Sequence, residues 1–217
     1  MLKNSNGSVF AFTLSKKKLC RRWRLYVITM PDTTARQCEK VREAILGGAD
    51  AIQLRDKLAT DEDMTRQAKA LLRVARAHQV PLIVNDRIAV AKQSGADGLH
   101  LGQDDGSLAA AKAVLGEHRI YGRSTHSPEQ ALGAEKEGFD YIGIGPVFET
   151  PTKAGRPAVG IELVRYAAAN IGIPFVAIGG IDSGNIGPVR RAGARAVAVV
   201  RAVMDAADPR KAARELK

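Results

Sequence analysis

Four polar clusters in this chain of 217 residues each follow a short apolar run. They are Gln53-Leu54-Arg55-Asp56-Lys57, Asn85-Asp86-Arg87, Gly102-Gln103-Asp104-Asp105 and Thr150-Pro151-Thr152-Lys153. Their side chains supply cations, carboxylates, amides and hydroxyls. Side chains at the carboxyl ends of neighbouring parallel strands meet on one rim of a sheet. If the apolar runs are such strands, the four clusters predict a single site.

The first cluster suits a polyanion. Gln53, Arg55 and Lys57 are two residues apart, so an extended backbone directs all three side chains to the same side. Two cations and an amide on one side match the charge of a diphosphate. A solvated strand end is the alternative interpretation, because a single Lys or Arg is most often exposed.

The second and third clusters supply carboxylates. Asp86 ends the third apolar run, and Asp104-Asp105 follow the fourth. Adjacent strands lie about 4.8 Å apart, so Asp86 and one member of the later pair can share a Mg²⁺ ion. The other interpretation is that Asp104 or Asp105 forms the N-cap of the next helix.

A second anion site is expected near the end of the chain. Gly179-Gly180 ends the seventh apolar run, and Val199-Val200-Arg201 ends the eighth. In (β/α)8 barrels the loops after strands seven and eight commonly bind phosphate. The polar loop at 150–153 can close over a ligand with its hydroxyls and its lysine. We therefore expect a diphosphate site beside the carboxylates and a separate monophosphate site.

These clusters depend on a regular alternation of elements after Arg24. Eight short β-rich runs are separated by helical patterns of about 10 to 15 residues, which is typical of βαβ units. The runs are Leu25–Met30, Ala51–Leu54, Leu82–Asn85, Gly98–Leu101, Ile120–Gly122, Tyr141–Val147, Phe175–Gly179 and Ala196–Val200. The pattern predicts an α/β fold, a single (β/α)8 TIM barrel over residues 24–217. An open doubly wound sheet is the alternative, although no G-x-G-x-x-G motif opens its first helix.

The helical segments carry their own signals. Between the second and third runs, apolar residues recur at three and four positions, which predicts a buried stripe of Met64, Ala68, Leu71, Leu72 and Ala75. Ser127 followed by Pro128, with Gln130 two positions later, predicts a helix start. His100 lies inside the fourth run and is expected to be a packed, hydrogen-bonded core residue.

Charge and composition limit the choice of partners. The net charge is +10, but residues 1–24 hold seven basic and no acidic residues, so the remainder carries only +3. With aromatic residues at 5%, the body has little with which to stack bases, and we expect no nucleic-acid partner. No apolar run approaches the roughly 20 residues of a membrane span, so no membrane partner is expected. Cys20 and Cys38 form no disulfide framework, which favours the reducing cytoplasm.

Residues 1–23 are predicted to be a basic, disordered extension. They contain serines and no acidic residue, as transit peptides do, but a disordered extension is the simpler interpretation. We therefore expect that deletion of residues 1–22 leaves the activity unchanged.

The ordered set of motifs resembles the thiamine phosphate synthase family from about Leu25 to the C-terminus. The motifs are the segments 53–57, 85–87, 96–105, 124–126, 145–153 and 178–181, which read QLRDK, NDR, ADGLHLGQDD, STH, GPVFETPTK and IGGI. Each is short, but their order and spacing together are specific. The resemblance implies a Mg²⁺-dependent transferase that joins a hydroxymethylpyrimidine diphosphate to a thiazole phosphate and releases pyrophosphate. Its partners would be these two small phosphorylated substrates.

The resemblance also assigns roles to residues. It implies that Arg55, Lys57 and Lys153 are catalytic and that Asp86 and Asp105 bind the metal. The pyrimidine diphosphate site would comprise Gln53, Leu54, Arg55, Asp56, Lys57, Asn85, Ser124 and Lys153. The thiazole phosphate site would comprise Thr150, Pro151, Thr152, Gly180, Val200 and Arg201.

Two residues depart from the family pattern. Arg201 stands where a small residue, often Ser, is expected, and Arg195 replaces an acidic or neutral residue. A thiazole tautomerase-like paralogue and a catalytically silent barrel that binds a phosphorylated ligand stay open as alternatives. Whether the chain forms a homo-oligomer is also open.

Overall fold

Eight parallel strands close into a barrel in the order of the sequence. The structure is a computed structural model that describes residues 15–150 and 157–217. The strands are β1 (Leu25–Ile28), β2 (Ala51–Leu54), β3 (Leu82–Asn85), β4 (Gly98–Leu101), β5 (Ile120–Thr125), β6 (Tyr141–Ile144), β7 (Phe175–Ile178) and β8 (Ala196–Val199). Strand β1 pairs with both β2 and β8, so the sheet has no edge. The predicted (β/α)8 barrel is confirmed, and the open sheet is wrong.

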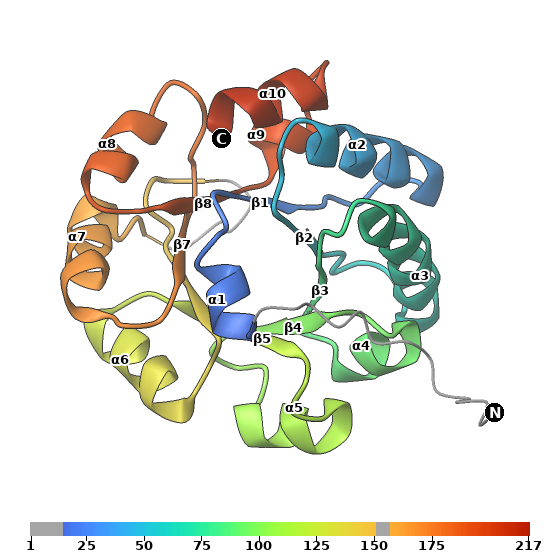
Figure 1. The fold of residues 1–217 in the computed structure, drawn as a ribbon, viewed down its shortest axis with the longest axis horizontal. Coiled ribbons are helices and arrows are strands. Elements are labelled where there is room, and N and C mark those ends of the chain that lie inside the picture. The colour runs from blue at the N-terminus through green and yellow to red at the C-terminus, as the bar shows by residue number, and fades with distance from the viewer. Residues whose placement is uncertain (1–14, 151–156) are drawn as a thin grey trace.

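Helices surround the barrel (Figure 1). They are α2 (Thr34–Leu46), α3 (Asp61–Ala77), α4 (Ile88–Ser94), α5 (Leu108–Leu115), α6 (Pro128–Glu137), α7 (Gly160–Asn170), α8 (Ile186–Arg191), α9 (Arg201–Met204) and α10 (Pro209–Leu216). The predicted apolar stripe of α3 is buried against the sheet. Helix α6 begins as predicted, because the Ser127 hydroxyl accepts a hydrogen bond from the Gln130 N–H. Within the described residues no helix has the length and apolarity to span a membrane.

Five strands end at other residues than predicted: β1, β7 and β8 stop one or two residues early, and the ends of β5 and β6 each differ by three residues. Strand β5 continues beyond Gly122 through the polar residues Arg123, Ser124 and Thr125, which pair with β6. Strand β6 stops at Ile144, because Pro146 has no N–H with which to continue the ladder. The longer β5 brings Ser124 onto the barrel itself rather than into a loop.

Three aspartates join neighbouring strands at the amino-terminal end of the barrel. The carboxylates of Asp50, Asp97 and Asp140 accept hydrogen bonds from the backbone N–H groups of Leu25, Leu82 and Tyr121 at 3.0, 3.0 and 2.9 Å. Each follows a glycine two residues earlier that has a positive φ, as expected for a helix end. Arg195 occupies the corresponding position before β8 and is exposed. At this position an arginine therefore stands where the other three junctions have an aspartate that joins two strands.

The last part of the basic extension is ordered. Lys16–Cys20 form helix α1, so the expected disorder is wrong for this segment. The Lys16 ammonium donates to the carbonyls of Glu117 and Arg119, in the loop that enters β5, at 2.7 and 2.8 Å. Helix α1 therefore lies across the amino-terminal end of the barrel (Figure 1). Cys20, the last residue of this helix, and Trp23, which follows it, are both buried.

The apolar core forms two layers that follow the alternation of side chains along each strand. On β1, Leu25 and Val27 belong to the layer between the barrel and the helices, whereas Tyr26 and Ile28 face the barrel interior. Trp23 packs edge-on against Tyr26, with ring centroids 5.5 Å apart. Large aromatic side chains thus fill the lower interior, and the space above them stays available for a ligand.

Candidate active site

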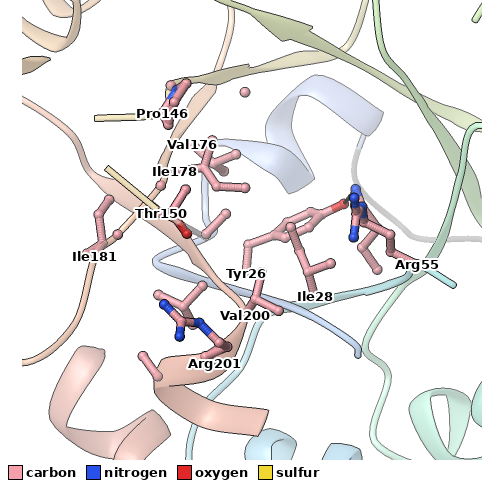
Figure 2. Close-up of a pocket in the computed structure, with 18 of the residues that line it drawn as sticks. Tyr26, Ile28, Arg55, Pro146, Thr150, Val176, Ile178, Ile181, Val200 and Arg201 are labelled. Atoms are coloured by element: carbon pink, nitrogen blue, oxygen red, sulfur yellow. Dashed lines mark hydrogen bonds between the residues drawn. The ribbon is translucent and has the colours of Figure 1, made fainter. Parts of the chain in front are cut away.

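A cavity of about 400 Å³ lies at the carboxyl end of the barrel. Residues from all the strands and from several of the loops after them line it, and Figure 2 shows Arg55 and Arg201 at separate places on its wall. The cavity brings together eight of the residues named from the sequence: Gln53, Arg55, Asn85, Ser124, Thr150, Gly180, Val200 and Arg201. The two expected substrate sites therefore share one space.

The remaining sequence-predicted residues do not line the cavity or lie outside the described part. The Leu54 side chain is fully buried in the layer between barrel and helices, so only its backbone is near the site. Lys57, Asp86 and Asp105 do not line the cavity, but Asp86 directly follows the lining residue Asn85 and lies 4.0 Å from Lys57. Pro151, Thr152 and Lys153 fall outside the described residues.

Asp56 has a structural task in the loop after β2. Its carboxylate is buried and accepts hydrogen bonds from the N–H groups of Leu58 and Ala59 at 3.0 and 3.1 Å. It also accepts from the Gln67 amide at 3.3 Å. These bonds shape the turn that exposes Lys57 at the mouth, and they leave Asp56 poorly placed to contact a ligand.

Asp86 and Asp105 form a hydrogen-bonded carboxyl pair. Burial, together with the hydrogen bond to Asp105 and its negative charge, raises the pKa of Asp86 to about 6. Burial alone would raise the pKa of Asp105, but hydrogen bonds from Asp86 and from the Gly102 N–H outweigh it and lower that pKa. The Gly102 N–H donates to Asp105 at 2.6 Å. The pair therefore holds a proton, on Asp86, only below about pH 6. The Lys57 ammonium lies 4.0 Å from Asp86.

This pair fits a Mg²⁺ ion. Two adjacent carboxylates in which burial and repulsion raise one pKa are a site at which a divalent cation can stabilise both negative charges. The described residues contain no group of three or more His, Cys, Asp or Glu able to hold a metal. A two-carboxylate set is nevertheless what Mg²⁺ takes when waters and a substrate phosphate complete its shell. Neither Asp104 nor Asp105 caps the next helix, because Ser107 does so.

The second anion site is built from a close approach of two loops. The N–H groups of Val147 and Phe148 donate to the carbonyls of Ile178 and Gly179 at 2.8 and 3.0 Å, which draws the loop after β6 onto the end of β7. Gly180 has a φ of +64°, and a Cβ there would lie 2.7 Å from the Glu149 carbonyl oxygen. Only glycine fits this position without strain. Thr150 and Gly180 consequently line the same part of the cavity.

Arg201 gives this end of the cavity a cationic side chain. It begins α9, directly after Val200, and its side chain is exposed. Asp182 and Asp205 also line the cavity, so two carboxylates outnumber the one cation at this end. An incoming phosphate group would therefore be attracted by this guanidinium and repelled by the two carboxylates.

A chain of buried hydrogen bonds forms the floor, and the sequence reasoning missed most of it. The links are Gln53 to Tyr26 at 2.9 Å, Tyr26 to Tyr141 at 2.8 Å, Tyr141 to His100 at 2.9 Å, and His100 to Ser124 at 2.9 Å. His100 is buried and hydrogen-bonded, as predicted. A tyrosine within an apolar run resembles any core residue, so the sequence held no signal for the part played by Tyr26 and Tyr141.

The geometry defines a class of protein: a (β/α)8 barrel with a cavity lined by polar and charged side chains at the carboxyl ends of its strands. A model of the thiamine monophosphate synthase family matches residues 25–203. The chain therefore belongs to that family, whose members are transferases.

Individual proteins agree with this membership. A thiamine-phosphate synthase from Thermus thermophilus is 46% identical over 89% of this chain and 95% of its own length. One from Synechocystis is 45% identical over 88% of this chain, which spans only 55% of that longer protein. The solved structure of a thiamine phosphate pyrophosphorylase from Pyrococcus furiosus is 40% identical, covers 93% of this chain and 95% of its own, and superposes with a TM-score of 0.81.

Proposed function

We propose that this chain catalyses thiamine phosphate synthesis. It would condense 4-amino-2-methyl-5-(diphosphooxymethyl)pyrimidine with a thiazole phosphate and release pyrophosphate. The observation that carries the proposal is that one cavity is lined both by Arg55 and by Thr150 and Gly180. A reaction between two phosphorylated substrates needs two anion sites that open into one space.

Asp86 and Asp105 would hold the Mg²⁺ ion. When bound, the ion would neutralise charge on the diphosphate as the carbon–oxygen bond breaks. Arg55 and Lys57 act on the same group: their positive charges stabilise the departing pyrophosphate. Lys153, which we assign from the sequence, would add a third cation from the loop over the site.

The remaining residues bind and orient the two substrates. Gln53, Asn85 and Ser124 would contact the pyrimidine. The thiazole phosphate would be held by the loop residues Thr150, Pro151 and Thr152 and by Gly180, Val200 and Arg201. An aminopyrimidine delocalises the positive charge left after bond cleavage, and the thiazole nitrogen then attacks that carbon. Bond formation needs no general base, because the attacking nitrogen carries no proton to remove.

Two other functions were open from the sequence. A thiazole tautomerase-like paralogue would have no use for a diphosphate apparatus, whereas this chain keeps Arg55, Lys57 and the Asp86–Asp105 pair. A catalytically silent barrel would bind the same phosphorylated ligands without turnover. Only an assay of turnover distinguishes such a silent barrel from an enzyme.

The test is pyrophosphate release by the purified chain. We expect release that requires Mg²⁺ and both substrates together, and a sharp loss of rate in Arg55→Ala. The matched control is Arg66→Ala, because Arg66 is an exposed arginine on the outer face of α3. A folded protein with no turnover above background under these conditions would refute the proposal.

We further propose a cytoplasmic enzyme that works without nucleic acid. The support is the free state of both cysteines, Cys20 and Cys38, and the use of Lys16 within the fold rather than at a polyanion site. Unchanged activity after treatment with nuclease and reductant is the expected result. Light scattering of the purified chain measures whether it forms a homo-oligomer.

A further inference from the structure

The hydrogen-bond chain beneath the cavity crosses the barrel through five different strands. Gln53 lies on β2, Tyr26 on β1, Tyr141 on β6, His100 on β4 and Ser124 on β5. All five side chains line the cavity. Gln53 and Ser124 stand at the two ends of this hydrogen-bond chain. The proposed function places both residues in contact with the pyrimidine. The three middle residues thus connect two ligand-binding groups that lie on strands that are not neighbours.

The donor and acceptor of every hydrogen bond in this hydrogen-bond chain follow from those of its first bond, between Gln53 and Tyr26. The Gln53 amide donates its N–H to the Tyr26 oxygen. A tyrosine hydroxyl has one proton, and a buried proton without an acceptor is costly, so Tyr26 donates to its other partner, Tyr141. By the same reasoning Tyr141 donates to Nδ1 of His100. Burial raises the pKa of both tyrosines, so the two hydroxyls keep their protons.

The direction also fixes the two ends. Because Nδ1 of His100 accepts, the neutral ring carries its proton on Nε2 and donates it to the Ser124 oxygen. The Ser124 hydroxyl proton is then available to a ligand. At the other end, the Gln53 amide uses its N–H on Tyr26 and offers its oxygen. The floor of the cavity therefore presents an acceptor at Gln53 and a donor at Ser124.

We infer that Tyr26, Tyr141 and His100 are positioning residues that set this acceptor–donor pattern and so select an amino-substituted pyrimidine. An aminopyrimidine offers the complement, an N–H donor on the amino group and an acceptor on a ring nitrogen. An oxo-pyrimidine offers the reverse, a carbonyl acceptor and a ring N–H donor. This inference rests on the proposed function and deepens it, because it names what distinguishes the correct pyrimidine.

The first test reads the His100 tautomer without any substrate. Nitrogen-15 NMR distinguishes a protonated from an unprotonated imidazole nitrogen. The chain has four histidines, so loss of one signal set in His100→Gln assigns His100. We expect the proton on Nε2 in the wild-type protein and a mixture of tautomers in Tyr141→Phe. A proton on Nδ1 in the wild-type protein would overturn the inference.

The second test measures ligand choice. Dissociation constants for the amino-pyrimidine diphosphate and for its oxo analogue are compared by calorimetry, with Mg²⁺ and without the thiazole phosphate. The wild-type protein should prefer the amino compound at least about hundredfold. In Tyr141→Phe the broken chain lets both ends reorient, and the preference should fall about tenfold or more. Tyr26→Phe breaks the hydrogen-bond chain one bond earlier. It replaces Tyr141→Phe in this test if that variant does not fold.

Tyr121→Phe is the matched control. Tyr121 is a buried tyrosine that donates to the Gly116 carbonyl at 2.6 Å, in the layer outside the barrel. It loses one hydrogen bond without touching the chain, so its ligand preference should equal that of the wild type. Equal preferences in Tyr141→Phe and the wild type, or no preference in the wild type, would overturn the inference. Absence of turnover with both substrates would instead refute the proposed function and leave the tautomer result intact.

Discussion

Replacing Asp86 with Asn should stabilise the metal-free protein while abolishing its function. Burial and the neighbouring Asp105 raise the pKa of Asp86 from 3.8 to about 6, so the folded state favours the protonated carboxyl. Asparagine has a similar shape and no charge. It also tolerates the left-handed backbone at this position, where φ is +64°. The substitution thus isolates the cost of the charge.

The magnitude follows from the same pKa. At about 1.4 kcal/mol for each tenfold change in proton affinity, a rise from 3.8 to about 6 corresponds to about 3 kcal/mol. Since the folded pKa lies above the unfolded one, the wild type is unpenalised below about pH 4 and loses stability as the pH rises to about 6. We expect Asp86→Asn to gain about 1 to 3 kcal/mol in free energy of unfolding at pH 7.5 and almost nothing near pH 4.

The assay is urea unfolding in EDTA at several pH values, followed by turnover with Mg²⁺. Asp104→Asn is the control, since Asp104 is an exposed residue beside Asp105 and the substitution removes the same charge. Asp104→Asn should change neither the free energy of unfolding nor the turnover by much. A lower stability of Asp86→Asn at pH 7.5, or a gain that is equal at pH 4, would refute the reasoning. So would full activity at ordinary Mg²⁺ concentrations.

Three further predictions test other parts of the molecule. Deletion of residues 1–22 uncovers Trp23 and should lower the free energy of unfolding by ~2–4 kcal/mol, which urea unfolding measures. It should also reduce turnover in a rate assay, contrary to our expectation from the sequence. Gly180→Ala should raise the KM for the thiazole phosphate at least about tenfold, because its Cβ meets the Glu149 carbonyl, whereas Gly133→Ala in an open position of α6 should not. Arg201→Ser should raise the same KM a few-fold and weaken its dependence on salt, while the KM for the pyrimidine diphosphate stays constant.

The barrel was predictable because its signal is local. Each strand is a short apolar run, and runs of four residues such as Ala51–Leu54 and Leu82–Asn85 were predicted to the residue. The rule that ligands bind at the carboxyl ends of parallel strands then placed Arg55, Asn85 and Gly180 around one cavity. That rule depends only on chain direction, so errors in strand length did not affect it.

Other features depend on neighbours that the sequence does not name. Asp56 looked like a ligand-binding residue because it lies between Arg55 and Lys57, but its carboxylate is used by the turn that exposes Lys57. The short helix α1 looked like part of a disordered tail because it belongs to a basic segment that contains serines and no acidic residue. Its order comes from contacts more than a hundred residues away, such as that between Lys16 and Arg119.

The hydrogen-bond chain shows why the interior of a barrel is the hardest part to predict. Sequence order gives the neighbours of each strand, but it does not say which side chains meet across the barrel. Tyr26 on β1 and Tyr141 on β6 are separated by two strands on the shorter way round, yet their hydroxyls lie 2.8 Å apart. The large aromatic rings that fill the lower barrel as core residues thereby orient the polar groups above them. Packing and ligand choice are properties of the same side chains, so a substitution such as Tyr141→Phe, which keeps the ring, separates one from the other.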